Sequence, residues 1–130
     1  MGDKLREVLD SIGDAADFFG VELQDVNQRG IYGNTPLKIA TVRGDIDAVR
    51  VLLGAGAAVD MIVEEDCTVL YYAAWFSRPE IVRILLDHGA SLDTRNSLSG
   101  YTPLEVAQDR GYAEVVTVLQ EYEGRSRPHH

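Results

Sequence analysis

Three segments of the sequence align with one another at spacings of 33 and 34 residues, since Thr35, Thr68 and Thr102 begin the matched stretches. A period of this length is typical of supersecondary units that stack in a row, because one unit alone cannot bury its apolar face. The match continues in each segment at positions that share an apolar side chain: Leu37, Leu70, Leu104, Ala40, Ala73, Ala107, Val49, Val82, Val116, Leu52, Leu85 and Leu119. The repeat therefore predicts a row of similar units.

Each segment is expected to form two short helices joined by a tight turn. The threonine is a favoured N-cap, because its hydroxyl accepts a backbone N–H of the first turn. Pro36 and Pro103 follow at the first helical position, where a missing N–H costs nothing. Gly44 and Gly111 tolerate the left-handed conformation that ends a helix. A second apolar pattern at helical spacing follows, as in residues 81–86.

These segments resemble the ankyrin repeat. The Thr-Pro-Leu-His-x-Ala start of that family matches residues 35–40 and 102–107, and residues 68–73 keep it without the proline. The second-helix pattern of the family is present at residues 81–86, followed by Gly89-Ala90. The resemblance covers about residues 33–123 in three units.

The sequence departs from the family pattern at several turn positions. No unit keeps the family histidine, because Lys38, Tyr71 and Glu105 stand in its place. The second unit also has Ser77 where the family has glycine. These losses are expected to weaken individual turns without changing the architecture.

The resemblance implies an all-α ankyrin-repeat solenoid of about four helix-turn-helix units with hairpin-like loops. We expect one domain over residues 1–124, with a degenerate capping unit at 1–32 and repeats at 33–65, 66–98 and 99–124. Two helices are expected in the capping unit, from the apolar residues Leu5, Val8, Leu9 and Ile12 and then Ala15, Ala16, Phe18 and Phe19. Residues 125–130 are expected to form a flexible tail, whose two histidines match the remains of an affinity tag.

The acidic balance limits the classes of partner. With 21 acidic and 12 basic side chains the formal charge is −9, which disfavours nucleic acid and anionic membrane and attracts a basic partner. The alternative is that this charge only keeps the protein soluble. The single cysteine, Cys67, excludes an internal disulfide, and the first twenty residues lack the apolar run of a signal peptide. We expect a cytoplasmic protein that is monomeric when free.

In the ankyrin family, partners usually meet the loop tips and the exposed side of the first helices. Mapped onto this chain, that face gives the expected partner-binding residues Tyr32, Asn34, Arg43, Met61, Ile62, Glu64, Glu65, Trp75, Phe76, Tyr101, Asp109 and Arg110. The same mapping places Ile31, Val42, Cys67, Leu98 and Ser99 on this face. The result is an aromatic patch bordered by acidic residues, and tryptophan and tyrosine are favoured interface anchors.

The stretch "YYAAWFS" at residues 71–77 divides between core and surface in this register. Tyr72 is expected in the core and Tyr71 in a bracing role at the position of the family histidine, while Trp75 and Phe76 face outward. The alternative is that Trp75 and Phe76 fold back into the groove between helices and serve stability only. The apolar tip Met61-Ile62-Val63 leaves a similar choice between a partner and a neighbouring loop.

Residues that would support catalysis are absent from the sequence pattern. Cys67 has no histidine near it in the repeat register, and nucleophilic catalysis needs an activating base. His88 falls in the last turn of a helix, where a cation is favourable, and no Cys/His cluster with metal-ligand spacing occurs. We therefore predict a non-catalytic protein-binding module without cofactor or metal. The alternative is a bacterial immunity or inhibitor protein that neutralises a basic toxin or enzyme.

Overall fold

The computed structural model describes residues 3–13, 25–30, 34–61 and 67–126. Across these ranges the chain forms seven helices and no strand. Their bounds are α1 (Asp3–Gly13), α2 (Pro36–Arg43), α3 (Ile46–Gly54), α4 (Val69–Trp75), α5 (Pro79–Asp87), α6 (Pro103–Arg110) and α7 (Ala113–Ser126). The expected all-α architecture is confirmed.

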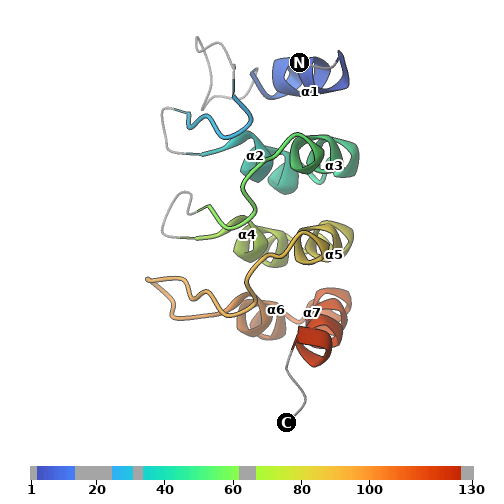
Figure 1. Ribbon diagram of the computed structural model, residues 1–130. Coiled ribbons are helices and arrows are strands. Elements are labelled where there is room, and N and C mark those ends of the chain that lie inside the picture. Colours follow the sequence, from blue (N-terminus) through green and yellow to red (C-terminus); the bar gives the residue numbers. More distant parts are fainter. Residues whose placement is uncertain (1–2, 14–24, 31–33, 62–66, 127–130) are drawn as a thin grey trace.

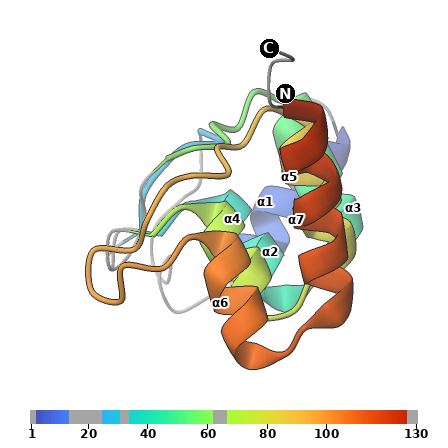
Figure 2. The same cartoon turned by 90° about the horizontal axis from the view of Figure 1, so that it is seen from below.

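The helices form two layers that run along the molecule (Figure 1). One layer, called here the first-helix layer, consists of α2, α4 and α6, and the second-helix layer consists of α3, α5 and α7. Within each layer successive helices contact one another, and each helix also contacts its partner in the other layer. The segment between α5 and α6 projects beyond the first-helix layer (Figures 1 and 2). This row of stacked pairs confirms the expected solenoid.

The threonine caps form as the sequence predicts. The Oγ1 atoms of Thr35, Thr68 and Thr102 each accept the backbone N–H three residues later, at 3.4, 3.4 and 3.2 Å. At the other end of the helix, Gly44 and Gly111 adopt φ angles of 74° and 73°. These contacts fix where each first helix begins and ends, and with them the faces that its side chains occupy.

A single core runs through the stack. The repeated leucines Leu37 and Leu70 of the first helices and Leu52, Leu85 and Leu119 of the second helices are all buried. Each lies between two layers and between neighbouring units, so a unit depends on its neighbours for burial.

Polar contacts between units fix the spacing of the row. The Oδ1 atom of Asn27 accepts the backbone N–H of Ala58 at 2.8 Å, and the Oδ1 atom of Asp60 accepts that of Ser91 at 2.9 Å. The guanidinium of Arg78 donates to the backbone carbonyl of Val42 at 2.8 Å. Adjacent units are therefore joined at two places, in the segments that follow the second helices and at the ends of the first helices.

The two ends differ from the sequence expectations in detail. α1 packs against both α2 and α3 through the buried Leu9 and Ile12, while the second helix expected around Ala15, Ala16, Phe18 and Phe19 lies outside the described residues. α7 continues to Ser126, past residue 124 where we expected the domain to end. Arg125 lies in this last turn, where a cation is favourable, and its guanidinium lies 4.9 Å from the Tyr122 ring centroid.

Candidate functional site

The expected partner-binding residues separate into three groups. Trp75, Phe76 and Tyr101 are 38%, 41% and 36% exposed, and Arg43, Asp109 and Arg110 are also exposed while Met61 is half-buried. Asn34 is buried. The remaining four, Tyr32, Ile62, Glu64 and Glu65, lie outside the described residues, so the acidic border of the expected face is represented here by Asp109 alone.

Two of the exposed aromatic residues, Trp75 and Phe76, line a hollow of about 300 Å³ between α4 and the loop that precedes α6. We call it the aromatic hollow, and it is lined by Cys67, Tyr71, Tyr72, Trp75, Phe76, Asn96, Leu98 and Ser99. Pockets for cofactors and drug-sized ligands span roughly 300–1,000 Å³. The aromatic hollow is at the low end of that range, which suits one large side chain better than a cofactor.

Trp75 is partly exposed and partly engaged within the chain. Its ring stacks on Tyr71 with centroids 6.2 Å apart and an interplanar angle of 22°. The guanidinium carbon of Arg110, on α6, lies 4.2 Å from the Trp75 ring centroid. The indole is therefore held in place by side chains from two successive units, and neither Trp75 nor Phe76 is sealed in the interior.

Tyr71 makes the kind of bracing contact that we expected, whereas Tyr72 is less buried than we expected. Tyr71 is buried, and its hydroxyl lies 3.4 Å from the Ser99 hydroxyl in the next loop. Tyr72 is only half-buried, with the Lys38 ammonium 4.7 Å from its ring centroid. Tyr72 therefore packs against the core without being fully enclosed in it, although we had expected it to be. The reason is that Tyr71 points toward the base of the next loop, whereas Tyr72 lies at the edge facing the preceding unit.

The loop at residues 94–101 is a self-bonded turn that presents Leu98. The Oδ1 atom of Asn96 accepts the backbone N–H groups of Leu98 and Ser99, both at 2.9 Å. The Asn96 backbone N–H donates to the Tyr101 carbonyl at 2.9 Å and closes the turn. Leu98 is 79% exposed at its tip. An aliphatic side chain is therefore held out toward solvent at the rim of the aromatic hollow.

Asn34 and Cys67 do not belong to the exposed face on which we placed them. They occupy the same register position, directly before the threonine cap, and both are buried at the base of a loop. The Asn34 carbonyl accepts the Gly30 N–H at 2.8 Å, and the Cys67 sulfur lies 2.6 Å from the Asn96 amide nitrogen. Arg43 is also turned away from this face, since it donates to the Ser11 carbonyl at 3.2 Å. The Asn34 backbone and the Cys67 and Arg43 side chains therefore take part in contacts within the chain, and Cys67 also lines the aromatic hollow.

Hydrogen bonds that involve a carboxylate shift the pKa values of two groups, Glu105 and Tyr122. Glu105 accepts the Thr102 backbone N–H at 3.1 Å and a guanidinium N–H of Arg95 at 2.9 Å, and the backbone bond above all lowers the pKa of Glu105. On α7, Tyr122 donates its hydroxyl proton to Asp87, and this hydrogen bond raises the pKa of Tyr122. The first contact joins the start of α6 to the loop before it, and the second joins α7 to α5.

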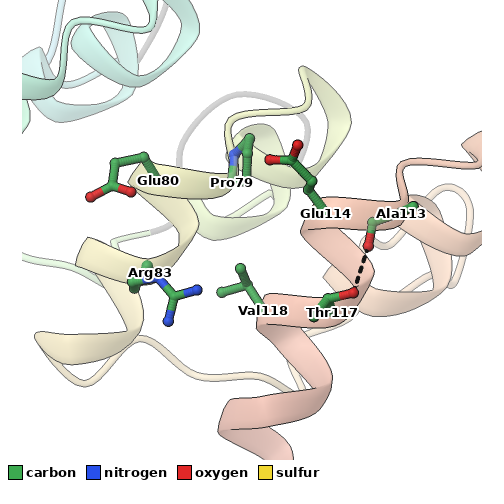
Figure 3. A pocket seen from close by; sticks show the side chains of 7 residues that line it. All are labelled: Pro79, Glu80, Arg83, Ala113, Glu114, Thr117 and Val118. Atoms are coloured by element: carbon green, nitrogen blue, oxygen red, sulfur yellow. Dashed lines mark hydrogen bonds between the residues drawn. The ribbon is translucent and has the colours of Figure 1, made fainter.

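A second, larger hollow of about 390 Å³ lies in the second-helix layer between α5 and α7 (Figure 3). Its lining includes Glu80, Arg83, Glu114 and Val118, and the figure shows the Arg83 side chain extending toward Val118. Glu80 pairs with Arg50 at 3.5 Å, and Arg83 pairs with Glu121 at 3.4 Å. Because Glu80 and Arg83 are already paired inside the chain, this hollow is a weaker candidate for a partner than the aromatic hollow.

Within the described ranges no group of three or more His, Cys, Asp or Glu side chains has the arrangement of a metal site. None of the described helices has the length and apolarity that a membrane crossing needs. Cys67 is buried and the His88 Nδ1 atom lies 2.9 Å from the Ile84 carbonyl oxygen.

The sequence analysis did not predict that the loop carrying Leu98 would line the candidate site. Leu98 and Ser99 were mapped to the face but left out of the expected binding residues. The available signal was the 34-residue spacing itself, since the extra residue falls in this loop. An Asn followed by small polar residues also favours a turn bonded by its own side chain.

The comparisons with known proteins match the whole row of units. A family model described as ankyrin repeats (3 copies) matches residues 11–96 and 68–127. The chain is 36% identical over 121 residues to the E3 ubiquitin-protein ligase Ufd4 of Drosophila melanogaster, covering 91% of the chain and 4% of that protein. It is 32% identical over 106 residues to the tyrosine-protein kinase HTK16 of Hydra vulgaris, covering 81% of the chain and 14% of the kinase.

A human relative has a similar level of identity. The chain is 37% identical over 87 residues to the ankyrin repeat and SOCS box protein 11, covering 67% of the chain and 26% of that protein. The chain therefore spans only 4% to 26% of the length of these three relatives.

Proposed function

Because this chain belongs to the ankyrin repeat family, whose repeats are generally protein–protein interaction modules, we propose that it binds a folded protein partner through the aromatic hollow and its rim. The observation that carries the proposal is the exposure of Trp75, Phe76 and Leu98, from two successive units, around one hollow. Large apolar side chains gathered at one exposed place mark interaction sites more often than single scattered ones.

The chemistry of the rim supports a protein partner. Aromatic side chains in a packed pocket give large contact area with few rotatable bonds, which is why a few of them dominate binding free energies. Trp75 is held by Tyr71 and Arg110, and Leu98 is held by the Asn96 turn, so little conformational entropy is lost when they are covered. The surface is thus already organised for binding.

The relatives favour binding over catalysis for this segment. Their names give different activities, a ubiquitin ligase and a tyrosine kinase, and the chain matches a small share of each. A segment common to proteins of such different chemistry is expected to contribute recognition. Ankyrin repeats are typically non-catalytic, and we propose the same for this protein.

The experiment places a photo-crosslinking amino acid at residue 76, or at residue 46 as a control, and irradiates the protein in an extract of its own cells. Ile46 is a matched control because it is 37% exposed, close to Phe76 at 41%, but belongs to the second-helix layer. We expect one protein to be crosslinked from position 76 and absent from position 46. Equal crosslinking from both positions would remove the proposal.

Affinity for the crosslinked protein then measures the contribution of the hollow. Phe76→Ala is expected to weaken binding by about 2 kcal/mol, or roughly thirtyfold, as for an interface anchor. Trp75→Ala is less direct, because it also removes the contacts with Tyr71 and Arg110. Unchanged affinity in Phe76→Ala, with the fold intact by circular dichroism, would show that the hollow is not the site.

The alternative function, an inhibitor or immunity protein against a basic toxin or enzyme, is supported by the formal charge of −9. Association with a basic partner should slow steeply as the salt concentration rises, because the field of the acidic protein steers the encounter. An association rate that does not depend on salt would count against this alternative and leave the binding-module proposal in place.

A further inference from the structure

Arg110 differs from four of the eight other arginines that the structure describes. Those four pair with a carboxylate of this chain, in the ion pairs Arg6–Asp10, Arg50–Glu80, Arg83–Glu121 and Arg95–Glu105. Arg110 makes no ion pair with the described residues, although the chain has 21 acidic against 12 basic side chains. With so many carboxylates present, the position of this cation beside the aromatic hollow calls for an explanation.

The Arg110 side chain is exposed but held in one place. Its guanidinium carbon lies 4.2 Å from the centroid of the Trp75 ring, which lines the aromatic hollow, and 5.7 Å from that of Tyr112. The Nε atom donates to the Tyr112 hydroxyl at 3.1 Å. This bond uses one edge of the planar guanidinium and leaves its terminal N–H groups available to an incoming acceptor. A guanidinium fixed on a ring loses little freedom when it binds.

We propose that the partner places a large apolar side chain in the aromatic hollow and a nearby carboxylate on Arg110. This inference rests on the proposed function and specifies its recognition chemistry. The ring of Trp75 contacts both places, so the two groups of the partner must be neighbours on its surface. The terminal N–H groups of a guanidinium match the two oxygens of a carboxylate, and such paired hydrogen bonds are strong and directional.

The alternatives fit less well. Sites for phosphorylated segments generally gather several arginines, whereas Arg110 is the arginine that contacts this part of the hollow in the described structure. A partner that is acidic throughout would be repelled by the charge of −9. The partner is therefore one with an isolated Asp or Glu beside its apolar anchor, on a surface that is neutral or basic elsewhere.

The test uses random peptides displayed on phage and selected against the intact protein. Peptides that lose at least about tenfold in affinity for Phe76→Ala identify occupants of the hollow. We expect these peptides to carry Asp or Glu beside a large apolar residue. Exchanging that acid for its amide should weaken binding to the wild-type protein by about tenfold, as for a charge-assisted hydrogen bond.

The same acid and amide peptides should bind equally well to Arg110→Gln. Arg125→Gln is the matched control, because Arg125 also lies over a ring, Tyr122, at 4.9 Å, but belongs to α7. This control should keep the preference for the acid. Phe76-dependent peptides without an acidic preference, or a preference that persists in Arg110→Gln, would overturn the inference alone. If no peptide depends on Phe76, the proposed function fails and this inference fails with it.

Discussion

The second unit (α4 and α5) and the third unit (α6 and α7) have the same backbone plan but differ in how well the sequence fits it. The third unit has proline at the first position of α6, a reciprocal cap between Thr102 and Glu105, and Gly111 in the left-handed conformation that ends the helix. The second unit lacks that proline and has Ser77, with φ 55°, at the position of the glycine. A left-handed conformation costs an ordinary residue about 1–2 kcal/mol.

The second unit, whose sequence matches the helix caps and turn less well, is the one that carries Tyr71, Tyr72, Trp75 and Phe76. The second unit can carry this cost because it lies between two neighbours, and burial between neighbouring units supplies much of the stability of a repeat protein. Among the described helices, the third unit contacts α4 and α5. The exposed aromatic side chains therefore belong to the unit that is packed between two described neighbours, and the unit with the better local fit is the one that presents fewer of them.

The largest expected effect compares one leucine of α4 with the matching leucine of α6. Leu70 is fully buried whereas Leu104 is half-buried. Leu70→Ala should lower the free energy of unfolding by about 2–5 kcal/mol, and Leu104→Ala by roughly half of that, because less apolar surface and cavity are at stake. Urea denaturation measures both. Equal losses would mean that the flanks of the two units are covered alike, and the comparison would fail.

The next effect concerns the turn that ends each first helix. Ser77→Gly should raise the free energy of unfolding by about 0.5–1 kcal/mol, since relief of the left-handed strain exceeds the added entropy of glycine in the unfolded chain. Gly111→Ala should lower it by about 1 kcal/mol. A Cβ atom at Gly111 would meet no other atom within 4 Å, so this loss reports backbone strain alone.

Thermal and urea unfolding of both turn variants provide the measurement. Gly54→Ala is a control for the exchange itself, because Gly54 is the last residue of α3 and a Cβ there also meets nothing within 4 Å. This control should stabilise the protein slightly through helix propensity. Destabilisation by Ser77→Gly would show that the second unit gains something from serine that the backbone angle does not reveal.

The elements of both units could be predicted from sequence because local rules decide them. The threonine caps, the turn glycines Gly44 and Gly111 and the apolar spacing depend on residues a few positions apart, and the structure has all three where we expected them. The repeat period then fixed the stacking order. The candidate site was predicted less well, because it depends on contacts between units that a period does not encode.

The sequence did not predict the different burial of the three residues that precede a threonine cap, Asn34, Cys67 and Tyr101. Asn34 and Cys67 were placed on the surface, but the position before a threonine cap faces the base of a loop and is buried in the first two units. The matching residue of the third unit, Tyr101, is exposed. The extra residue in the loop before α6 accounts for part of this difference, because it lets the Asn96 turn form and changes what the base of the loop covers.

The smallest expected effect is a pH dependence that only the third unit has. At the position three residues after the cap, the third unit has Glu105, whereas the second unit has Tyr71 and no carboxylate. The Thr102 backbone N–H, and to a lesser degree Arg95, lowers the pKa of Glu105 below its ordinary value of 4.5. A carboxylate whose pKa is lowered by folding stabilises the folded state above that ordinary value, and this stabilisation is lost as the pH falls through the lowered pKa.

The variant Glu105→Gln keeps an acceptor for the Thr102 backbone N–H but cannot titrate. Its free energy of unfolding should therefore fall less steeply than that of the wild type between about pH 7 and about pH 3. Urea denaturation across this range measures the two slopes. Glu114→Gln is the matched control, because Glu114 is an exposed acid in the first turn of α7 that takes no part in a cap. If both variants flatten the profile equally, the effect belongs to net charge, and the reciprocal cap no longer distinguishes the third unit from the second.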